Sequence, residues 1–263
     1  MTDFTLEPLS EDALLLRFGD GIDPATNARV HAAARALRDA HLPGLIDIAP
    51  AYASLLLRFD PSLWIDSKCA RPFERITAEI ARLDPGLRRD DELGRGSHPE
   101  TGFAPARTIE IPVCYGGEYG PDLEVVAAHA RTGVEDVVAR HAGSEYIVAM
   151  LGFAPGFPYL LGLDPILHTP RRATPRTRVP AGSVSIGGAQ TGIYPRELPG
   201  GWQVIGRTPM VLFDPQRDPP CLLAPADRVR FRAIRNAQFE RLREKYSHEE
   251  PAPAPRDRGR SQQ

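Results

Sequence analysis

The chain has 263 residues, of which 42% are hydrophobic and 25% are charged, the balance expected of a globular protein with one large or two modest domains. Its net charge of −2 offers no basic surplus to nucleic-acid phosphates, and its apolar runs are too short to span a bilayer. Its first residues have no basic stretch followed by an apolar segment, so no signal peptide is expected. Three widely spaced cysteines without a CxxC pair argue against a disulfide framework or a zinc cage, so we expect a protein of the reducing cytoplasm.

Residues 1–83 are predicted to form one α/β domain. Strand-like apolar runs or alternation occupy 13–18, 45–49 and 54–59, and a helix with Asp23 as its N-cap lies between the first two. A second helix is expected after Asp60-Pro61. The residues expected on the buried faces of these two helices are Val30, Ala33, Ala34 and Leu37, and Phe73, Ile76, Ile80 and Leu83. Two helices on one face of a small, mostly antiparallel sheet is the simplest assembly.

Two segments are predicted to have little structure. Residues 84–105 mix charges and glycines with almost nothing to bury, which is typical of a flexible linker. Residues 246–263 contain several prolines and are predicted to be a disordered tail.

Residues 106–245 are predicted to form a second, β-rich domain. It begins with a strand at 108–113, followed by two short helices, of which the second is opened by a capping box at Thr132–Glu135 and ended by Gly143. Short strands separated by proline and glycine turns predict a closed barrel or a sandwich. These strands are expected at 146–151, 184–186, 203–205, 210–213 and 229–231.

The segment from 150 to 220 is the richest in candidate functional residues. It contains 12 prolines and 10 glycines in 71 positions, interleaved with aromatic residues. Proline and glycine together fix loops in one shape, which suits a preorganised site. The aromatic side chains either plug the end of the barrel or form a ligand wall. The residues considered for this wall are Phe157, Tyr159 and Trp202.

Arginines and glycines in this segment suggest an anion site. Four arginines between Pro170 and Pro180 could grip an anion with little loss of entropy, although a solvated surface strip is the alternative. The backbone N–H groups of Gly187 and Gly188 could form an anion nest or an oxyanion hole, and a tight hairpin turn explains them equally well.

Several common catalytic signatures are missing from the sequence. There is no Walker-type phosphate loop for ATP and no Gly-x-Ser-x-Gly elbow for a serine nucleophile. There is also no H-E-x-x-H pair, so the sequence predicts no metal ligands. His141 could be a base at the mouth of the barrel, or it could simply end its helix.

The phrases GFAPGFPYL, PRRATPR, VPAGSVSIGG, QTGIYP, PGGW and IGRTP follow one another in this order. The chain thereby resembles the allophanate hydrolase subunit 1 family of carboxyltransferase-domain subunits, which includes the B-type subunit of 5-oxoprolinase and the Kip-type kinase inhibitor. The resemblance implies an α+β protein, with a ferredoxin-like N-terminal domain followed by a cyclophilin-like β-barrel. Matching these motifs, we expect Arg171, Arg176 and Arg207 to bind anions. Ser183, Gln190 and Tyr194 would orient polar atoms.

The resemblance also implies a shared activity. A relative of this kind would act with two other oxoprolinase subunits, one of carboxyltransferase type and one of lactam-utilisation type, to convert 5-oxoproline and ATP to L-glutamate. ATP and Mg²⁺ would then be bound mainly by or with the partners, and this chain would be inactive alone. The alternatives are an inhibitor of a sensor histidine kinase and a urea- or allophanate-processing component. No general base or nucleophile is assigned.

Overall fold

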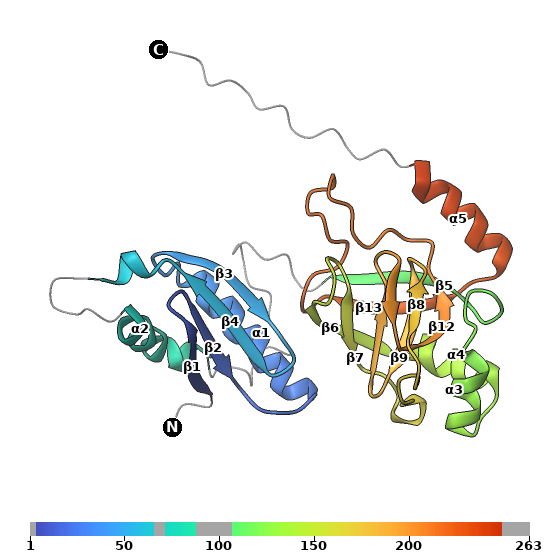
Figure 1. Ribbon diagram of the computed structural model, residues 1–263, viewed down its shortest axis with the longest axis horizontal. Coiled ribbons are helices and arrows are strands. Elements are labelled where there is room, and N and C mark those ends of the chain that lie inside the picture. Colours follow the sequence, from blue (N-terminus) through green and yellow to red (C-terminus); the bar gives the residue numbers. More distant parts are fainter. Residues whose placement is uncertain (1–3, 66–71, 88–106, 249–263) are drawn as a thin grey trace, which may run out of the picture.

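A computed structural model of the chain describes residues 4–65, 72–87 and 107–248. These residues form an N-terminal unit with a small sheet and a C-terminal unit with a barrel, each built around its own hydrophobic core (Figure 1). The mixed α/β character and the closed barrel agree with the sequence prediction. The finer descriptions of the two units, ferredoxin-like and cyclophilin-like, and the domain boundaries stay predictions.

The N-terminal unit is a four-stranded antiparallel sheet in the order β1-β2-β4-β3 with helices on one face. Alternate side chains of the central strands, such as Leu14 and Leu16, share a core with the apolar faces of both helices. The elements are β1 (Thr5–Ser10), β2 (Ala13–Arg17), α1 (Pro24–Asp39), β3 (Leu45–Pro50), β4 (Ser54–Phe59), a 3₁₀ turn (Pro61–Trp64) and α2 (Pro72–Leu87).

Helix α1 begins where the sequence predicts. The carboxylate of Asp23 accepts a hydrogen bond of 2.7 Å from the backbone N–H of Thr26, and Pro24 occupies the first turn, where its missing N–H costs nothing. The predicted buried faces of both helices are confirmed, since all their members belong to the core or pack against it. The second helix begins later than predicted, because Pro61–Trp64 forms only a 3₁₀ turn.

The C-terminal unit contains a closed barrel in the order β10-β7-β6-β13-β5-β12-β9. A separate two-stranded sheet, β8 with β11, belongs to the same unit, and helices accompany the barrel (Figure 1). The strands are β5 (Thr108–Tyr115), β6 (Glu145–Leu151), β7 (Pro158–Leu161), β8 (Arg176–Val179), β9 (Ser183–Gly187), β10 (Gln190–Ile193), β11 (Leu198–Gly200), β12 (Gln203–Arg207) and β13 (Arg228–Ala233), and the helices are α3 (Leu123–Ala130), α4 (Val134–Gly143) and α5 (Asn236–His248).

Two local predictions for this unit are wrong. The segment 210–213 is not a strand. Phe213 is the one residue of this segment that pairs with another segment, in an isolated bridge to Cys221. The capping box does not form either, because Gly133 is the N-cap of α4 and the hydroxyl of Thr132 donates instead to Asp136 at 2.6 Å.

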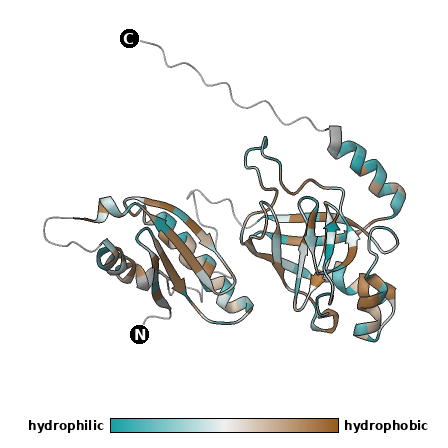
Figure 2. Cartoon of the chain, in the orientation of Figure 1, coloured by the Kyte–Doolittle hydropathy of each residue, from teal (hydrophilic) through white to brown (hydrophobic). Residues whose placement is uncertain are grey.

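Some elements have no counterpart in the sequence prediction. Strands β1, β7, β8, β10 and β11 are short or contain proline or glycine, and α5 is mostly hydrophilic (Figure 2). The predicted linker begins within α2, and its remainder at 88–105 lies outside the described residues. The predicted tail overlaps the end of α5 at His248, and 249–263 lie outside the described residues as well. No helix in the described ranges is both long and apolar enough to cross a membrane.

Candidate functional site

The candidate site lies on the outer face of the barrel wall. Side chains of β9 alternate across the wall, so Val184 and Ile186 belong to the barrel core while Ser183, Ser185 and Gly187 face the other way. These outward residues are nevertheless fully buried. A second layer of side chains must therefore cover this part of the wall.

An aromatic cluster forms that second layer. The ring of Phe157 lies 5.2 Å from that of Tyr194 and 5.8 Å from that of Trp202, both nearly edge-on. Tyr159 lies at its margin, with its ring 5.9 Å from that of Trp202. The members of this aromatic cluster are Ala154, Phe157, Val179, Tyr194, Trp202 and Val204, with Tyr159 and Leu198 packed against them.

Glycines in the wall allow the rings to approach this closely. A Cβ atom at Gly187 would lie 2.6 Å from the ring of Trp202, and one at Gly192 would lie 3.0 Å from the ring of Phe157. The spacing of glycines in the sequence therefore has a physical cause here, because any larger side chain at Gly187 would displace the indole.

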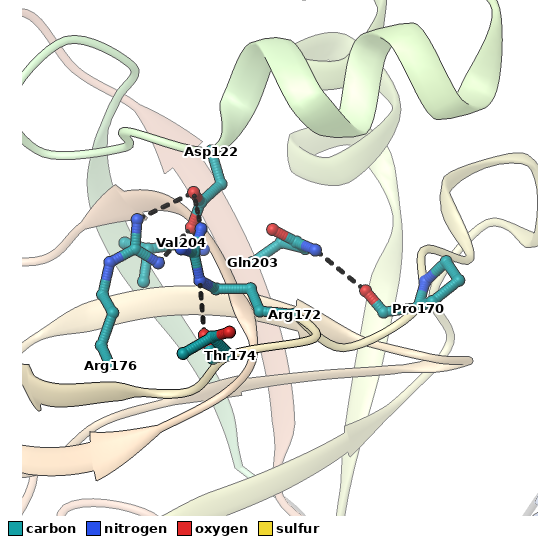
Figure 3. A network of polar contacts seen from close by, with 7 residues as sticks. All are labelled: Asp122, Pro170, Arg172, Thr174, Arg176, Gln203 and Val204. Carbon is teal, nitrogen blue, oxygen red and sulfur yellow. Dashed lines mark hydrogen bonds and ion pairs between the residues drawn. The ribbon is translucent and has the colours of Figure 1, made fainter.

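A buried carboxylate beside this cluster holds two arginines (Figure 3). Asp122 is 2% exposed, receives both terminal nitrogens of Arg176 at 2.7 and 2.8 Å, and receives one from Arg172 at 3.0 Å. It also accepts the backbone N–H of Val204 at 2.7 Å. Asp122 thus ties the arginine strip, which is the segment from Arg171 to Arg178, to β12.

The pKa of Asp122 reflects a balance of opposing effects. Burial by itself would raise the pKa, but the hydrogen bonds from Arg176 and from the N–H of Val204, together with the charges of Arg176 and Arg172, hold it below its ordinary value. The pKa of Arg176 is raised, chiefly by its hydrogen bond to Asp122. Asp122 is therefore ionised at neutral pH, and Arg176 is already engaged by a protein anion.

Arg171 differs from its neighbours in the strip. It is exposed, and its guanidinium lies over the ring of Trp202, 5.6 Å from the centroid. Among the described residues it forms no ion pair, whereas Arg172 and Arg176 pair with Asp122 and Arg178 pairs with Glu197. Arg171 is thus the arginine of the strip whose charge is available to a ligand.

Arg207 lies at the other end of β12 and does not join this group. Its guanidinium is 5.7 Å from the ring centroid of Tyr119, and its buried Nε has no partner in the described part of the chain. Ser183 is its cross-strand neighbour and is likewise buried with an unpartnered hydroxyl. The structure therefore divides the predicted anion binders between two places.

The remaining predicted polar groups have different surroundings. The N–H of Gly188 donates to the carbonyl of Thr169 at 2.8 Å, so it is not available as an oxyanion donor, and the tight hairpin turn between β9 and β10 explains the glycine pair. Gln190 is the cross-strand partner of Gly187, on which the ring of Trp202 rests. The hydroxyl of Tyr194 packs against Gly200.

His141 is not at the mouth of the barrel. It is fully buried, its ring is stacked 4.6 Å from Phe231, and its nitrogens lie 2.8 Å from the hydroxyl of Tyr115 and 3.1 Å from that of Thr191. Burial lowers its pKa to about 3, so the ring is neutral at physiological pH. The arrangement is that of a hydrogen-bonded core histidine.

Asp122 is the residue that the sequence analysis missed. It stands directly before α3 and looks like an ordinary helix cap in the sequence, yet its side chain makes no cap hydrogen bond. Its partners are 50 and 54 residues away, so no local pattern signals the pairing. For metal binding, the described residues contain no group of three or more His, Cys, Asp or Glu side chains that could hold an ion.

Comparisons with known proteins agree on a family. The family model described as "Carboxyltransferase domain, subdomain C and D" matches residues 4–223. The chain is 41% identical to the B-type subunit of 5-oxoprolinase from Bacillus subtilis over 92% of this chain and 97% of that protein. It is 45% identical to the protein of the same name from Escherichia coli O157:H7, over 85% of this chain and 93% of that one.

A solved structure supports the same relation. The crystal structure of TTHA0988 superposes on 86% of this chain with a TM-score of 0.68 and 39% identity. This chain spans only 40% of the TTHA0988 chain, so the matching region there is part of a longer polypeptide. From the family match over residues 4–223 and the near full-length similarity to two relatives, we conclude that the chain belongs to the family of carboxyltransferase domains, subdomains C and D.

Proposed function

We propose that this chain is one subunit of a multi-component, ATP-dependent 5-oxoprolinase, which cleaves 5-oxoproline to L-glutamate together with two partner subunits. Its similarity to relatives named as the B-type subunit of 5-oxoprolinase extends over nearly their whole length and supports this assignment. One partner is of carboxyltransferase type and the other is of lactam-utilisation type. The two units of the chain are then a ferredoxin-like and a cyclophilin-like domain joined by the linker, and the complex works in the cytoplasm.

One structural observation supports a location for the substrate-binding site. Arg171 has no ion-pair partner among the described residues, and its guanidinium lies over the indole of Trp202. A guanidinium binds a carboxylate through paired hydrogen bonds, and 5-oxoproline carries a carboxylate. The indole is only 6% exposed, so it supports the guanidinium of Arg171 and does not itself contact the lactam.

The neighbouring residues have supporting roles in this proposal. Asp122 fixes Arg172 and Arg176, which follow Arg171 in the sequence, so the strip loses little entropy when Arg171 binds the substrate. Gln190 lies beside the indole across the hairpin, and no hydrogen bond links its side chain to another described residue. It would donate to the lactam oxygen. Arg207 and Ser183 would form a separate anion contact.

The activity needs ATP because a lactam resists hydrolysis. Phosphorylation of the lactam oxygen turns a poor electrophile into a reactive one, which water can then open. The described residues do not fit a bound metal, since they offer no cluster of ligands, and we assign no step of the reaction to Mg²⁺ or ATP on this chain. Both would be held mainly by or with the partner subunits, and this chain would be inactive alone.

The test is glutamate release from 5-oxoproline with ATP and Mg²⁺, using this chain and both partner subunits and omitting each in turn. We expect glutamate only from the complete mixture. Glutamate at an undiminished rate without this chain would contradict the proposal. No glutamate from a verified, folded complex would also contradict it, and would favour a urea-like substrate or inhibition of a kinase.

A further inference from the structure

The outer face of the barrel wall carries a second group of polar side chains, around Arg207 at the end of β12. Arg207 pairs with Ser183 of β9 on one side and with Cys114 of β5 on the other. Cross-strand neighbours lie on the same face of a sheet, and both of these neighbours alternate with residues of the barrel core. Arg207 therefore lies on the outer face, between a hydroxyl and a thiol.

The guanidinium of Arg207 is held in place by packing. A Cβ atom at Gly182 would lie 3.3 Å from the Cγ of Arg207, so the glycine makes room for the aliphatic stem. The guanidinium lies over the ring of Tyr119, 5.7 Å from the centroid. The hydroxyl of Tyr119 lies 3.0 Å from Oδ1 of Asn236 and 2.8 Å from a carboxylate oxygen of Glu240, so α5 holds this ring.

Two buried polar atoms meet no partner at this place. Neither Nε of Arg207 nor the hydroxyl oxygen of Ser183 forms a hydrogen bond within the described part of the chain. Ser183 is fully buried, whereas Arg207 is half-buried and still reaches solvent. A buried donor without an acceptor costs stability, so native proteins keep few of them. A charged and a neutral donor on neighbouring strands indicate a ligand with several acceptor oxygens.

The acidic side chains nearby do not supply these oxygens. Glu240 accepts a hydrogen bond from Tyr119 and pairs with Arg243. Glu118 is exposed and forms no ion pair with Arg207. Within the ranges that the structure describes, the positive charge of Arg207 is therefore not neutralised by the protein.

We propose that Arg207 and Ser183 bind a phosphate group. A guanidinium forms two parallel hydrogen bonds to phosphate oxygens, and a further oxygen is left to accept from the hydroxyl of Ser183. This inference rests on the proposed function, in which Arg171 binds the carboxylate of 5-oxoproline and ATP supplies the other anion. The group is either the terminal phosphate of ATP or the inorganic phosphate released from it.

The test is a calorimetric titration of the full chain with inorganic phosphate at constant ionic strength. We expect saturable binding that weakens at least about tenfold in Arg207→Gln, because paired hydrogen bonds to a charge are lost. Ser183→Ala should weaken binding about 3- to 10-fold. Its melting temperature without phosphate should stay equal or rise, because a buried hydroxyl without a partner is removed.

Ser185→Ala is the matched control. It removes a hydroxyl that is equally buried and equally without a partner in the described chain, from the same face of β9. Its cross-strand neighbours are Val204 and Gly192, neither of which carries a charge. Phosphate affinity should therefore be unchanged in this variant, and an equal loss in Ser183→Ala and Ser185→Ala would contradict the inference.

Other outcomes also decide the matter. The inference is overturned if the natural chain shows no saturable binding, if folded Arg207→Gln binds phosphate as tightly, or if acetate binds as tightly as phosphate. Should Arg207→Gln fail to fold, Ser183→Ala decides in the same way. Displacement of phosphate by ATP would support the terminal phosphate as the ligand, and no displacement would support free phosphate. Failure of the proposed function is seen separately, because a complex that assembles but makes no glutamate leaves the titration result standing.

Discussion

The arginine strip contains two kinds of cation that composition alone does not distinguish. Arg172 and Arg176 are half-buried and neutralised by Asp122, whereas Arg171, the immediate neighbour of Arg172, is exposed over Trp202. The difference has a simple cause, since one carboxylate has two oxygens and a backbone N–H already uses part of their capacity. Paired arginines shape the strip, and the remaining one is available for binding.

Arg171→Ala should weaken substrate binding without unfolding the protein. Loss of a charged hydrogen-bonding group corresponds to roughly 1.5–3 kcal/mol, so we expect the KM for 5-oxoproline to rise about 10- to 100-fold in the assembled complex. Arg178→Ala is the matched control, because that arginine is exposed and paired with Glu197. Equal kinetic effects of the two substitutions would contradict the proposed role of Arg171.

Asp122→Asn should destabilise the C-terminal unit. It would leave Arg172 and Arg176, whose side chains are 33% and 26% exposed, without their counter-charge. Because partial exposure softens the loss, we expect the free energy of unfolding in urea to fall by about 2 kcal/mol, somewhat less than for a fully buried pair. Glu197→Gln breaks an exposed pair and should change it by less than about 0.5 kcal/mol. Equal losses would show that burial of Asp122 is unimportant.

At the level of elements, β9 and β12 position the aromatic cluster. The outward face of β9 carries Ser183, Ser185 and Gly187, small residues on which a second layer can rest. The indole of Trp202 occupies the space that a side chain at Gly187 would fill. A strand that is buried on both faces thus supports the barrel core on one side and the candidate site on the other.

Gly187→Ala should displace the indole. Overpacking at a contact of 2.6 Å is expected to cost about 1–3 kcal/mol of the free energy of unfolding. In a Trp64→Phe background Trp202 is the only tryptophan, so its fluorescence maximum should shift to longer wavelength as the ring becomes solvated. Gly143→Ala is the control, since a Cβ there meets nothing within 4 Å. An unshifted spectrum would mean that the wall adapts without moving Trp202.

At the scale of the whole molecule, the two units meet beside the candidate site. Strand β6 is irregular between Val148 and Met150, and the amide of Asn27 in α1 donates to the carbonyl of Ala149 at 3.4 Å. The ring of Tyr52 lies edge-on to that of Tyr159, at 6.1 Å between centroids. The N-terminal unit therefore reaches the margin of the aromatic cluster.

Both units contain a buried histidine that should make the protein sensitive to acid. Burial lowers the pKa of His141 to about 3, and burial together with the charge of Arg35 lowers that of His31 to about 4. The unfolded chain takes up these protons below its pKa of about 6.5, so stability falls as the pH decreases from about 6.5 towards 4. By pH 5 the loss is roughly 2 kcal/mol for each histidine.

Urea unfolding at pH 7.5 and pH 5 measures this loss. His141→Gln should be less stable than the natural chain at pH 7.5 but should lose less stability between the two pH values. His129→Gln changes an exposed histidine and should follow the natural chain. The same pH dependence in His141→Gln would show that protonation of His141 is not responsible.

The sequence by itself determined the features that depend on local patterns. The N-cap at Asp23, the buried stripes of α1 and α2, and the apolar strands follow from periodicity within one turn or one pleat. The ordered motifs of residues 152–209 likewise sufficed to indicate the family. Short strands such as β8 and β11 could not be predicted, because β8 has four residues of which only Val179 is apolar, and β11 consists largely of proline and glycine.

Only the tertiary structure decided which of the candidate residues act together. Asp122 meets Arg176 across 54 residues, the ring of Trp202 covers Gly187, and Arg207 lies apart from Arg171 although the sequence motifs predict anion binding for both. Closing the barrel brings these segments together or separates them. The sequence specifies each charge, but the pairing of charges depends on distances that exist only after folding.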